Sequence, residues 1–150
     1  MLHIFVDADA CPVKQEVYRV AGRHNLPVTL VANSHMRIPE GERFTLQVVA
    51  SGSDKADNWI AENVTPGDIV ITADILLAGR CLSAGAAVIG STGKPFTEDN
   101  IGQAVAIRNL LADLRGGSEN LGGGPPPMQQ RDRSRFLQEL ENTIQAIRRA

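Results

Sequence analysis

Short apolar runs alternate with segments of helical periodicity along the first two thirds of the chain. The apolar runs are rich in β-branched and aromatic residues, and each is too short to be a helix. They are residues 2–6, 27–33, 44–50, 67–73 and 86–90. Because these runs are apolar nearly throughout, they predict strands that are covered on both faces. We therefore expect a three-layer α/β/α fold with a mostly parallel central sheet of about five strands.

Helices are expected between these runs and after the last of them. The predicted helices are residues 12–25, 53–64, 74–85 and 97–114. Pro12 is expected at the first helical position, where its missing N–H costs nothing, and Thr97 is expected to cap the fourth helix. Together with the apolar runs, these helices complete the predicted βαβ alternation.

The last third of the chain changes character twice. Residues 116–130 are rich in Gly and Pro and predict a linker after a first domain at residues 1–115. Residues 131–150 carry apolar side chains at helical spacing and predict an amphipathic helix. This helix is expected to pack on the same domain or on a second subunit, which would give a homodimer.

Composition and charge narrow the function classes. The chain has 150 residues, which suits one domain with a real core, and its formal charge of −2 gives no global basic field. An anionic partner must therefore be held by a local patch or through a bound metal ion. The longest aliphatic stretch is interrupted by Asp74 and is too short to cross a membrane, and no signal segment precedes the first strand. We expect a cytoplasmic protein.

Acidic residues follow three of the predicted strands. Asp7 and Asp9 come after the first strand, Asp54 and Asp57 after the third, and Asp74 just past the fourth. In an open parallel sheet the carboxyl ends of the strands share one edge, and the ligand crevice lies outside it. The sequence therefore predicts a crevice with at least four carboxylates.

Several of these aspartates also have a structural explanation. Asp74 stands where an N-cap is expected, and Asp54 follows Ser51 at the spacing of a capping box. Asp57 differs, because a helical wheel places it beside the apolar flank of its helix, where an unpaired acid is unusual. Asp7 would be costly to bury without a partner. The acid that the helix after the third strand contributes to the site is therefore Asp57 or Asp54, with Asp57 favoured.

Crowded carboxylates need a compensating charge, and a divalent cation supplies it. Oxygen ligands suit Mg²⁺ or Mn²⁺, whereas the His and Cys residues have no zinc-site spacing. Such a centre is typical of phosphodiester hydrolysis. We expect Asp7, Asp9, Asp57 and Asp74 to bind the metal and act in catalysis. The expected phosphate contacts are Lys14, Asn33, Lys55 and Lys94.

Five blocks of the sequence resemble one protein family. The blocks "DADACPVK", "SGSDKADNWI", "GDIVITADILLA", "NI…R" and "DRSRF" are similar to those of the YaiI/YqxD family of bacterial proteins. That group is similar to the PIN-like nucleases, so the resemblance implies a PIN-like fold and an acidic, Mg²⁺- or Mn²⁺-dependent ribonuclease centre. It maps the first-strand acid onto Asp7 with Asp9 beside it, the middle-helix acid onto Asp57 or Asp54, and the last acid onto Asp74.

One departure from the PIN-like pattern keeps other functions open. PIN-like enzymes often carry a second acid shortly after the fourth strand, whereas "DILLAG" has none. A non-catalytic module that binds RNA or a partner protein is therefore an alternative. A second alternative is a haloacid-dehalogenase-type phosphatase, because "DADAC" resembles its nucleophile loop, although the later acidic motif has the wrong spacing.

Overall fold

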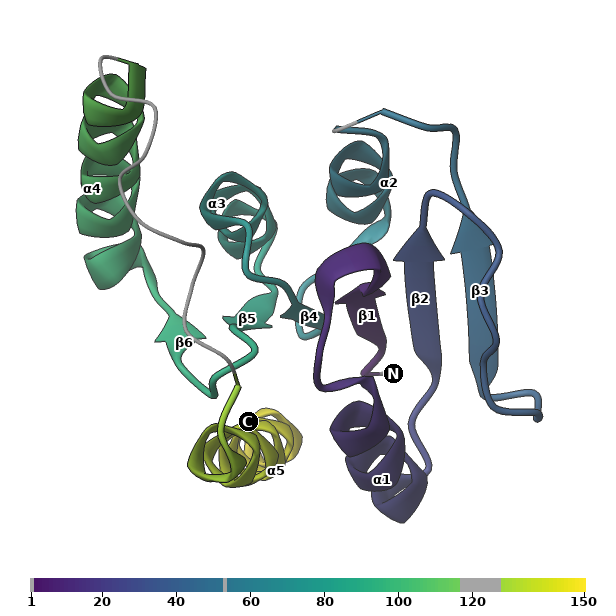
Figure 1. Cartoon of the computed structure of the whole chain (residues 1–150). Helices are drawn as coiled ribbons and strands as arrows, with labels where there is room; N and C mark the ends of the chain where they lie inside the picture. Colours follow the sequence, from purple (N-terminus) through teal and green to yellow (C-terminus); the bar gives the residue numbers. More distant parts are fainter. Residues whose placement is uncertain (1, 53, 117–127) are drawn as a thin grey trace.

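The central feature of the computed structural model is a six-stranded sheet in the order β3-β2-β1-β4-β5-β6 (Figure 1). The structure describes residues 2–52, 54–116 and 128–150. The strands are β1 Ile4–Asp7, β2 Val28–Ala32, β3 Phe44–Val48, β4 Ile69–Ile71, β5 Ala87–Ile89 and β6 Pro95–Phe96. All neighbouring strands pair in parallel except β5 and β6, which are antiparallel. The predicted mostly parallel sheet is confirmed, with one short edge strand added.

Helices cover both faces of the sheet, which confirms the three-layer α/β/α fold. They are α1 Lys14–His24, α2 Lys55–Asn63, α3 Ile75–Ser83, α4 Glu98–Gly116 and α5 Gln130–Arg149. Helices α2 and α3 lie on one side of the sheet and α1 and α5 on the other, while α4 stands at the outer edge beside α3 (Figure 1). No helix among the described residues is long and apolar enough to cross a membrane.

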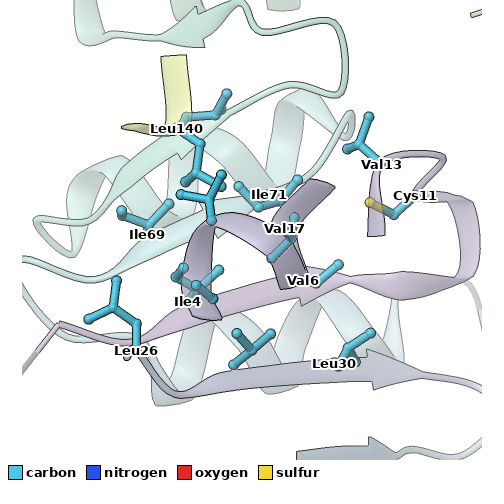
Figure 2. Close-up of a cluster of buried hydrophobic side chains, with 14 of the residues drawn as sticks. Ile4, Val6, Cys11, Val13, Val17, Leu26, Leu30, Ile69, Ile71 and Leu140 are labelled. Atoms are coloured by element: carbon cyan, nitrogen blue, oxygen red, sulfur yellow. The ribbon is translucent and has the colours of Figure 1, made fainter. Parts of the chain in front are cut away.

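Each face of the sheet has its own apolar core, because successive side chains of a strand point to opposite faces. Ile4 and Val6 of β1 pack toward α1 and α5, in the cluster that Figure 2 shows with Val17 of α1 and Leu140 of α5. Phe5, between them, packs in the second cluster with α2 and α3. By the same alternation Asp7 belongs to the α2–α3 side of the sheet.

Helix α5 returns to the sheet and completes the first core. Its apolar stripe, Phe136, Leu140 and Ile144, is 0% exposed within this single chain. The Nε2 of His24 in α1 lies 2.8 Å from an Oε of Glu141, which ties the two helices together at the surface. Most of the predicted 116–130 linker lies outside the described residues; its first residue ends α4, and α5 begins at Gln130.

A glycine brings the β5–β6 turn against α5. Gly93 has a φ of +85°, and a Cβ built on it would lie 2.7 Å from the backbone of Arg135. Its N–H donates to the carbonyl of Gly90 at 3.0 Å, which closes the turn. Both the left-handed backbone and the close approach require glycine at this position.

The start of α1 differs from the sequence prediction. Pro12 is not the first helical residue, since the helix begins at Lys14 with Val13 at the N-cap position. Residues Ala8–Ala10 instead form a short 3-10 helix, η1, directly after β1. The chain therefore turns immediately past Asp7, which changes the direction of the side chains that follow.

Candidate acidic site at the β1–β4 junction

Asp7 lies at the point where the strand order reverses, which is the usual ligand position in an open α/β sheet. It is the last residue of β1, and Thr72 follows the neighbouring strand β4. The Thr72 hydroxyl donates to Asp7 Oδ2 at 2.8 Å and accepts the backbone N–H of Asp74 at 3.0 Å. One hydroxyl therefore fixes the Asp7 carboxyl relative to the start of α3.

Asp74 is the N-cap of α3. Its Oδ1 accepts the N–H groups of Leu76 at 2.9 Å and Leu77 at 3.0 Å, so the capping role expected from the sequence is confirmed. Both bonds use the same oxygen. Capping therefore holds the Asp74 carboxylate in place without occupying Oδ2, and the structural role does not compete with a ligand role.

Asp57 is the acid with the most perturbed surroundings. It lies half-buried in the first turn of α2. Burial, followed by the negative charges of Asp74 and Asp7, raises its pKa from 3.8 to about 6, while Arg80 opposes the shift. Asp57 therefore holds its proton to a higher pH than an isolated aspartate does.

Burial is also the main cause that raises the pKa of Asp7. The Thr72 hydroxyl lowers that pKa, and the charges of Asp74 and Asp9 raise it further. Asp7, Asp57 and Asp74 thus form a cluster of three mutually repelling carboxyl groups, which we call the acidic cluster. They come from β1, α2 and the loop before α3.

Asp54 stands outside this cluster. It is the N-cap residue of α2, but its side chain is exposed and makes no capping hydrogen bond, so the capping box predicted with Ser51 is wrong. Of the two candidate acids near the start of α2, only Asp57 interacts with Asp7 and Asp74. Its position in the first turn places it on the same side of the helix as buried Ile60, as its helical phase indicated.

Asp9 is near the cluster but is engaged elsewhere. Its carboxylate is exposed, and Oδ2 accepts the backbone N–H of Asn33 at 2.9 Å. Asp9 lies in η1, and this turn aims its side chain at the end of β2. It acts on Asp7 through charge, as the smallest of the causes that shift the Asp7 pKa.

The predicted phosphate contacts are scattered around this edge. The Lys14 ammonium donates to two carbonyls of the η1 turn, at 3.1 and 3.0 Å, and so stabilises that turn. The side-chain Oδ1 of Asn33 is buried with no hydrogen-bond partner among the described residues. Lys55, at the start of α2, and Lys94, in the β5–β6 turn, are exposed.

The donor chemistry of the acidic cluster fits a hard divalent cation, but the cluster is not a closed ligand cage. Among residues 2–52, 54–116 and 128–150, no three His, Cys, Asp or Glu side chains are grouped tightly enough to hold a metal ion. Mg²⁺ usually keeps several waters and binds through one or two carboxylates, so it does not need such a cage. Arg80 is the cation acting on Asp57, and its guanidinium donates to Asn58 at 2.7 Å.

Two side chains of this edge were missed in the sequence. Thr72 orients Asp7, and Arg80 reaches from α3 to the first turn of α2. The role of Thr72 could have been suspected from the sequence, because Thr72 stands two residues before Asp74 at the end of a strand. No sequence pattern indicates the role of Arg80, because its proximity to Asp57 depends on how α2 and α3 pack. Cys11 is buried, and this burial raises the pKa of its thiol, which argues against a nucleophilic role.

Comparison with known proteins gives the family of the chain. The model of the "Uncharacterized BCR, YaiI/YqxD family" matches residues 5–146. The chain belongs to the YaiI/YqxD family. It is 55% identical over 149 residues to a UPF0178 protein of Rhodopseudomonas palustris strain TIE-1, covering 99% of this chain and 94% of the relative. It is also 55% identical over 150 residues to a UPF0178 protein of Parvibaculum lavamentivorans, covering 99% and 97%.

Membership in the YaiI/YqxD family confirms the resemblance drawn from the sequence blocks. No solved structure matches this chain. The likeness to PIN-like nucleases therefore stays a prediction. The names of these two relatives state no activity.

Proposed function

We propose that this YaiI/YqxD protein is an Mg²⁺- or Mn²⁺-dependent ribonuclease that hydrolyses phosphodiester bonds at the acidic cluster. One observation carries the proposal. Three carboxyl groups from separate elements converge where the strand order reverses, and burial, followed by their mutual repulsion, raises the pKa of Asp7 and of Asp57. An edge built for stability alone has no reason to place Asp57 beside two other acids, since the repulsion between them lowers stability.

Asp7, Asp57 and Asp74 are the residues that would hold the ion, with Asp9 adding negative charge at the margin. When bound, such an ion activates a water molecule and stabilises charge on the leaving oxygen. Oxygen ligands and retained water favour Mg²⁺ or Mn²⁺ over zinc at this position.

The chain's own residues prepare this arrangement. Thr72 holds the Asp7 carboxyl through a 2.8 Å hydrogen bond, and the α3 backbone holds Asp74 through two N–H groups. Such supporting bonds fix the orientation of ligands before the ion arrives. Asp57, with its pKa raised to about 6, carries a proton below that pH and releases it at neutral pH, when the cluster becomes most attractive to a cation.

RNA is the proposed substrate, and local cations would hold its phosphates. Lys55 and Lys94 are exposed, whereas Lys14 is occupied by the η1 carbonyls and leaves one donor free. With a net charge of −2, phosphate binding depends on these few side chains and on the metal ion.

Two measurements on the same proteins test the proposal. Calorimetric titration with Mn²⁺ and cleavage of a structured RNA in Mn²⁺ are compared for the native protein and Asp7→Asn. We expect heat of binding and cleavage from the native protein, and loss of both in the variant. Asp54→Asn, at an exposed acid outside the cluster, is the matched control and should behave like the native protein. Equal cleavage by the native protein and Asp7→Asn contradicts the assignment.

A second function is favoured by one observation: the described residues form no closed metal cage. A module that binds RNA or a partner protein through the same edge needs no metal ion. The calorimetry separates the two functions. Absence of Mn²⁺ heat, with RNA binding that Asp57→Asn does not weaken, supports the module and eliminates the nuclease.

A further inference from the structure

A cavity of about 460 Å³ opens directly beside Asp74, and we call it the α4 pocket. Its lining includes Ala73, Ile75, Lys94, Phe96, Gln103 and Ile107. Ala73 and Ile75 flank Asp74 in the chain, so this end of the pocket lies beside the N-cap residue of α3, which is one of the three acids of the acidic cluster. The opposite wall comes from β6 and α4, the elements at the outer edge in Figure 1. Its volume is in the range of small-molecule sites.

The walls of the α4 pocket are held in place by internal contacts. The Asn100 side chain donates to the carbonyl of Pro95 at 3.1 Å and accepts the N–H of Thr97 at 2.9 Å, which fastens the start of α4 to β6. The Phe96 ring packs over Gly90, where an added Cβ would lie 3.5 Å from the ring. The pocket is therefore formed before any ligand arrives.

Three kinds of group line this pocket, and together they suit a nucleotide. The half-buried Phe96 supplies an aromatic ring, and the exposed Gln103 supplies an amide that can donate and accept. The ammonium group of Lys94 supplies positive charge. Within the described part of the chain, the side chains of Gln103 and Lys94 form no hydrogen bond or ion pair. Stacking on a ring, an amide at the base edge and a cation at the phosphate are the means by which proteins hold unpaired nucleotides.

We infer that the α4 pocket binds an unpaired nucleobase next to the phosphate that lies at the acidic cluster, so that the substrate is single-stranded RNA. This inference rests on the proposed nuclease function and adds the substrate class to it. A base in a duplex is stacked on both faces and paired along its edge, and it cannot enter a pocket of this kind. The chain has few aromatic residues, and a pocket for a single base needs only one aromatic ring, that of Phe96.

The test is equilibrium binding of fluorescein-labelled RNA, followed by fluorescence anisotropy in EDTA, which prevents metal-dependent cleavage. A ten-nucleotide single strand is compared with a ten-base-pair duplex. We expect the native protein to prefer the single strand. Phe96→Leu keeps apolar volume but removes the ring, and it should weaken single-strand binding roughly tenfold. Equal affinity for single strand and duplex overturns the inference.

Substitutions at two exposed positions, Gln103 and Lys94, test the inference even if Phe96→Leu perturbs folding. Gln103→Ala should weaken single-strand binding, whereas Asn109→Ala, an exposed amide on the same helix outside the pocket lining, should not. Lys94→Gln should weaken binding and lower the salt dependence by about one counterion. Arg149→Gln, an exposed charge at the far end of α5, is its control. If Gln103→Ala and Lys94→Gln bind the single strand as tightly as their control variants do, the α4 pocket is not the base-binding site.

The experiments distinguish an error in the base-binding inference from an error in the nuclease proposal. Mn²⁺ calorimetry and cleavage depend on Asp7, whereas single-strand preference in EDTA depends on Phe96 and Gln103. Normal Mn²⁺ binding and cleavage with unaltered RNA binding by Gln103→Ala overturns the pocket alone. Loss of single-strand binding in Gln103→Ala, in a protein that binds no Mn²⁺, supports the pocket and removes the nuclease.

Discussion

Replacing Asp57 by Asn should stabilise the metal-free protein at neutral pH. Most substitutions of partly buried residues destabilise a protein, so the expected direction is unusual. It follows from the raised pKa of Asp57, which means that the folded state disfavours the ionised carboxyl beside Asp74 and Asp7. Asparagine has nearly the same shape as the protonated acid and carries no charge.

The pH dependence of this effect follows from the two pKa values. Below about pH 3.8 the carboxyl of Asp57 is protonated in both the folded and unfolded chain, and the substitution should change little. As the pH rises from 3.8 to about 6, the unfolded chain ionises first, and the folded protein loses stability. Above about pH 6 both states are ionised, and the loss stays constant. The advantage of Asp57→Asn should therefore grow between these values and then level off.

Screening by solvent limits the gain in unfolding free energy that Asp57→Asn should give. A shift of about two pKa units corresponds to at most about 3 kcal/mol of unfolding free energy. Asp57 is only half-buried, however, and water screens its repulsion from the other acids. We therefore expect a gain of about 1 kcal/mol at pH 7.

Urea denaturation in EDTA at several pH values measures this gain. Asp54→Asn is the matched control, because Asp54 lies three positions earlier, is exposed and makes no capping bond. It should show no comparable pH-dependent gain. Excess Mn²⁺ should reverse the order of stabilities, since the ion stabilises only a protein that binds it. If Asp57→Asn is no more stable than the native protein at pH 7 in EDTA, the proposed repulsion within the acidic cluster is wrong.

Three further substitutions test how the site and its support are built. Thr72→Val removes the hydroxyl that orients Asp7, and calorimetry should show roughly tenfold weaker Mn²⁺ binding, which Thr72→Ser restores. Gly93→Ala combines a left-handed backbone with a 2.7 Å approach to Arg135, so urea denaturation should show a loss of about 2 kcal/mol or more. Phe136→Ala empties a position that is 0% exposed and should cost about 3–5 kcal/mol, whereas a helix α5 that is only loosely attached predicts almost no change.

The sheet and the three members of the acidic cluster could be predicted because they depend on short-range patterns. The apolar runs fix the strands, and a parallel sheet brings the carboxyl ends of β1 and β4 to one edge, which places Asp7 and Asp74. The choice of Asp57 over Asp54 followed from helical phase. Each of these inferences uses only the local period of the chain.

The remaining features depend on contacts that sequence does not display. Asp9 lies in the short helix η1, which turns the chain directly after Asp7. Strand β6 has two residues and begins with a proline, so its pattern is too short to recognise. The α4 pocket joins the loop beside Asp74 to residues about 20 to 30 positions later, and only the packing of α4 on α3 brings them together.

Hydrogen bonds stabilise two of the three carboxyl groups of the acidic cluster and not the third. This difference is the strongest argument for a bound ligand. Thr72 donates to Asp7, and two backbone N–H groups donate to Asp74. Among the residues that the structure describes, the positive charge of Arg80 is the only interaction that favours the ionised Asp57 carboxyl, and the hydrogen bond of Arg80 goes to Asn58 instead. An edge built for stability alone would satisfy or discard the third acid. Asp57 ionises at about pH 6 near two carboxyl groups that are already fixed in position, and this leaves a negative charge that a bound cation would neutralise.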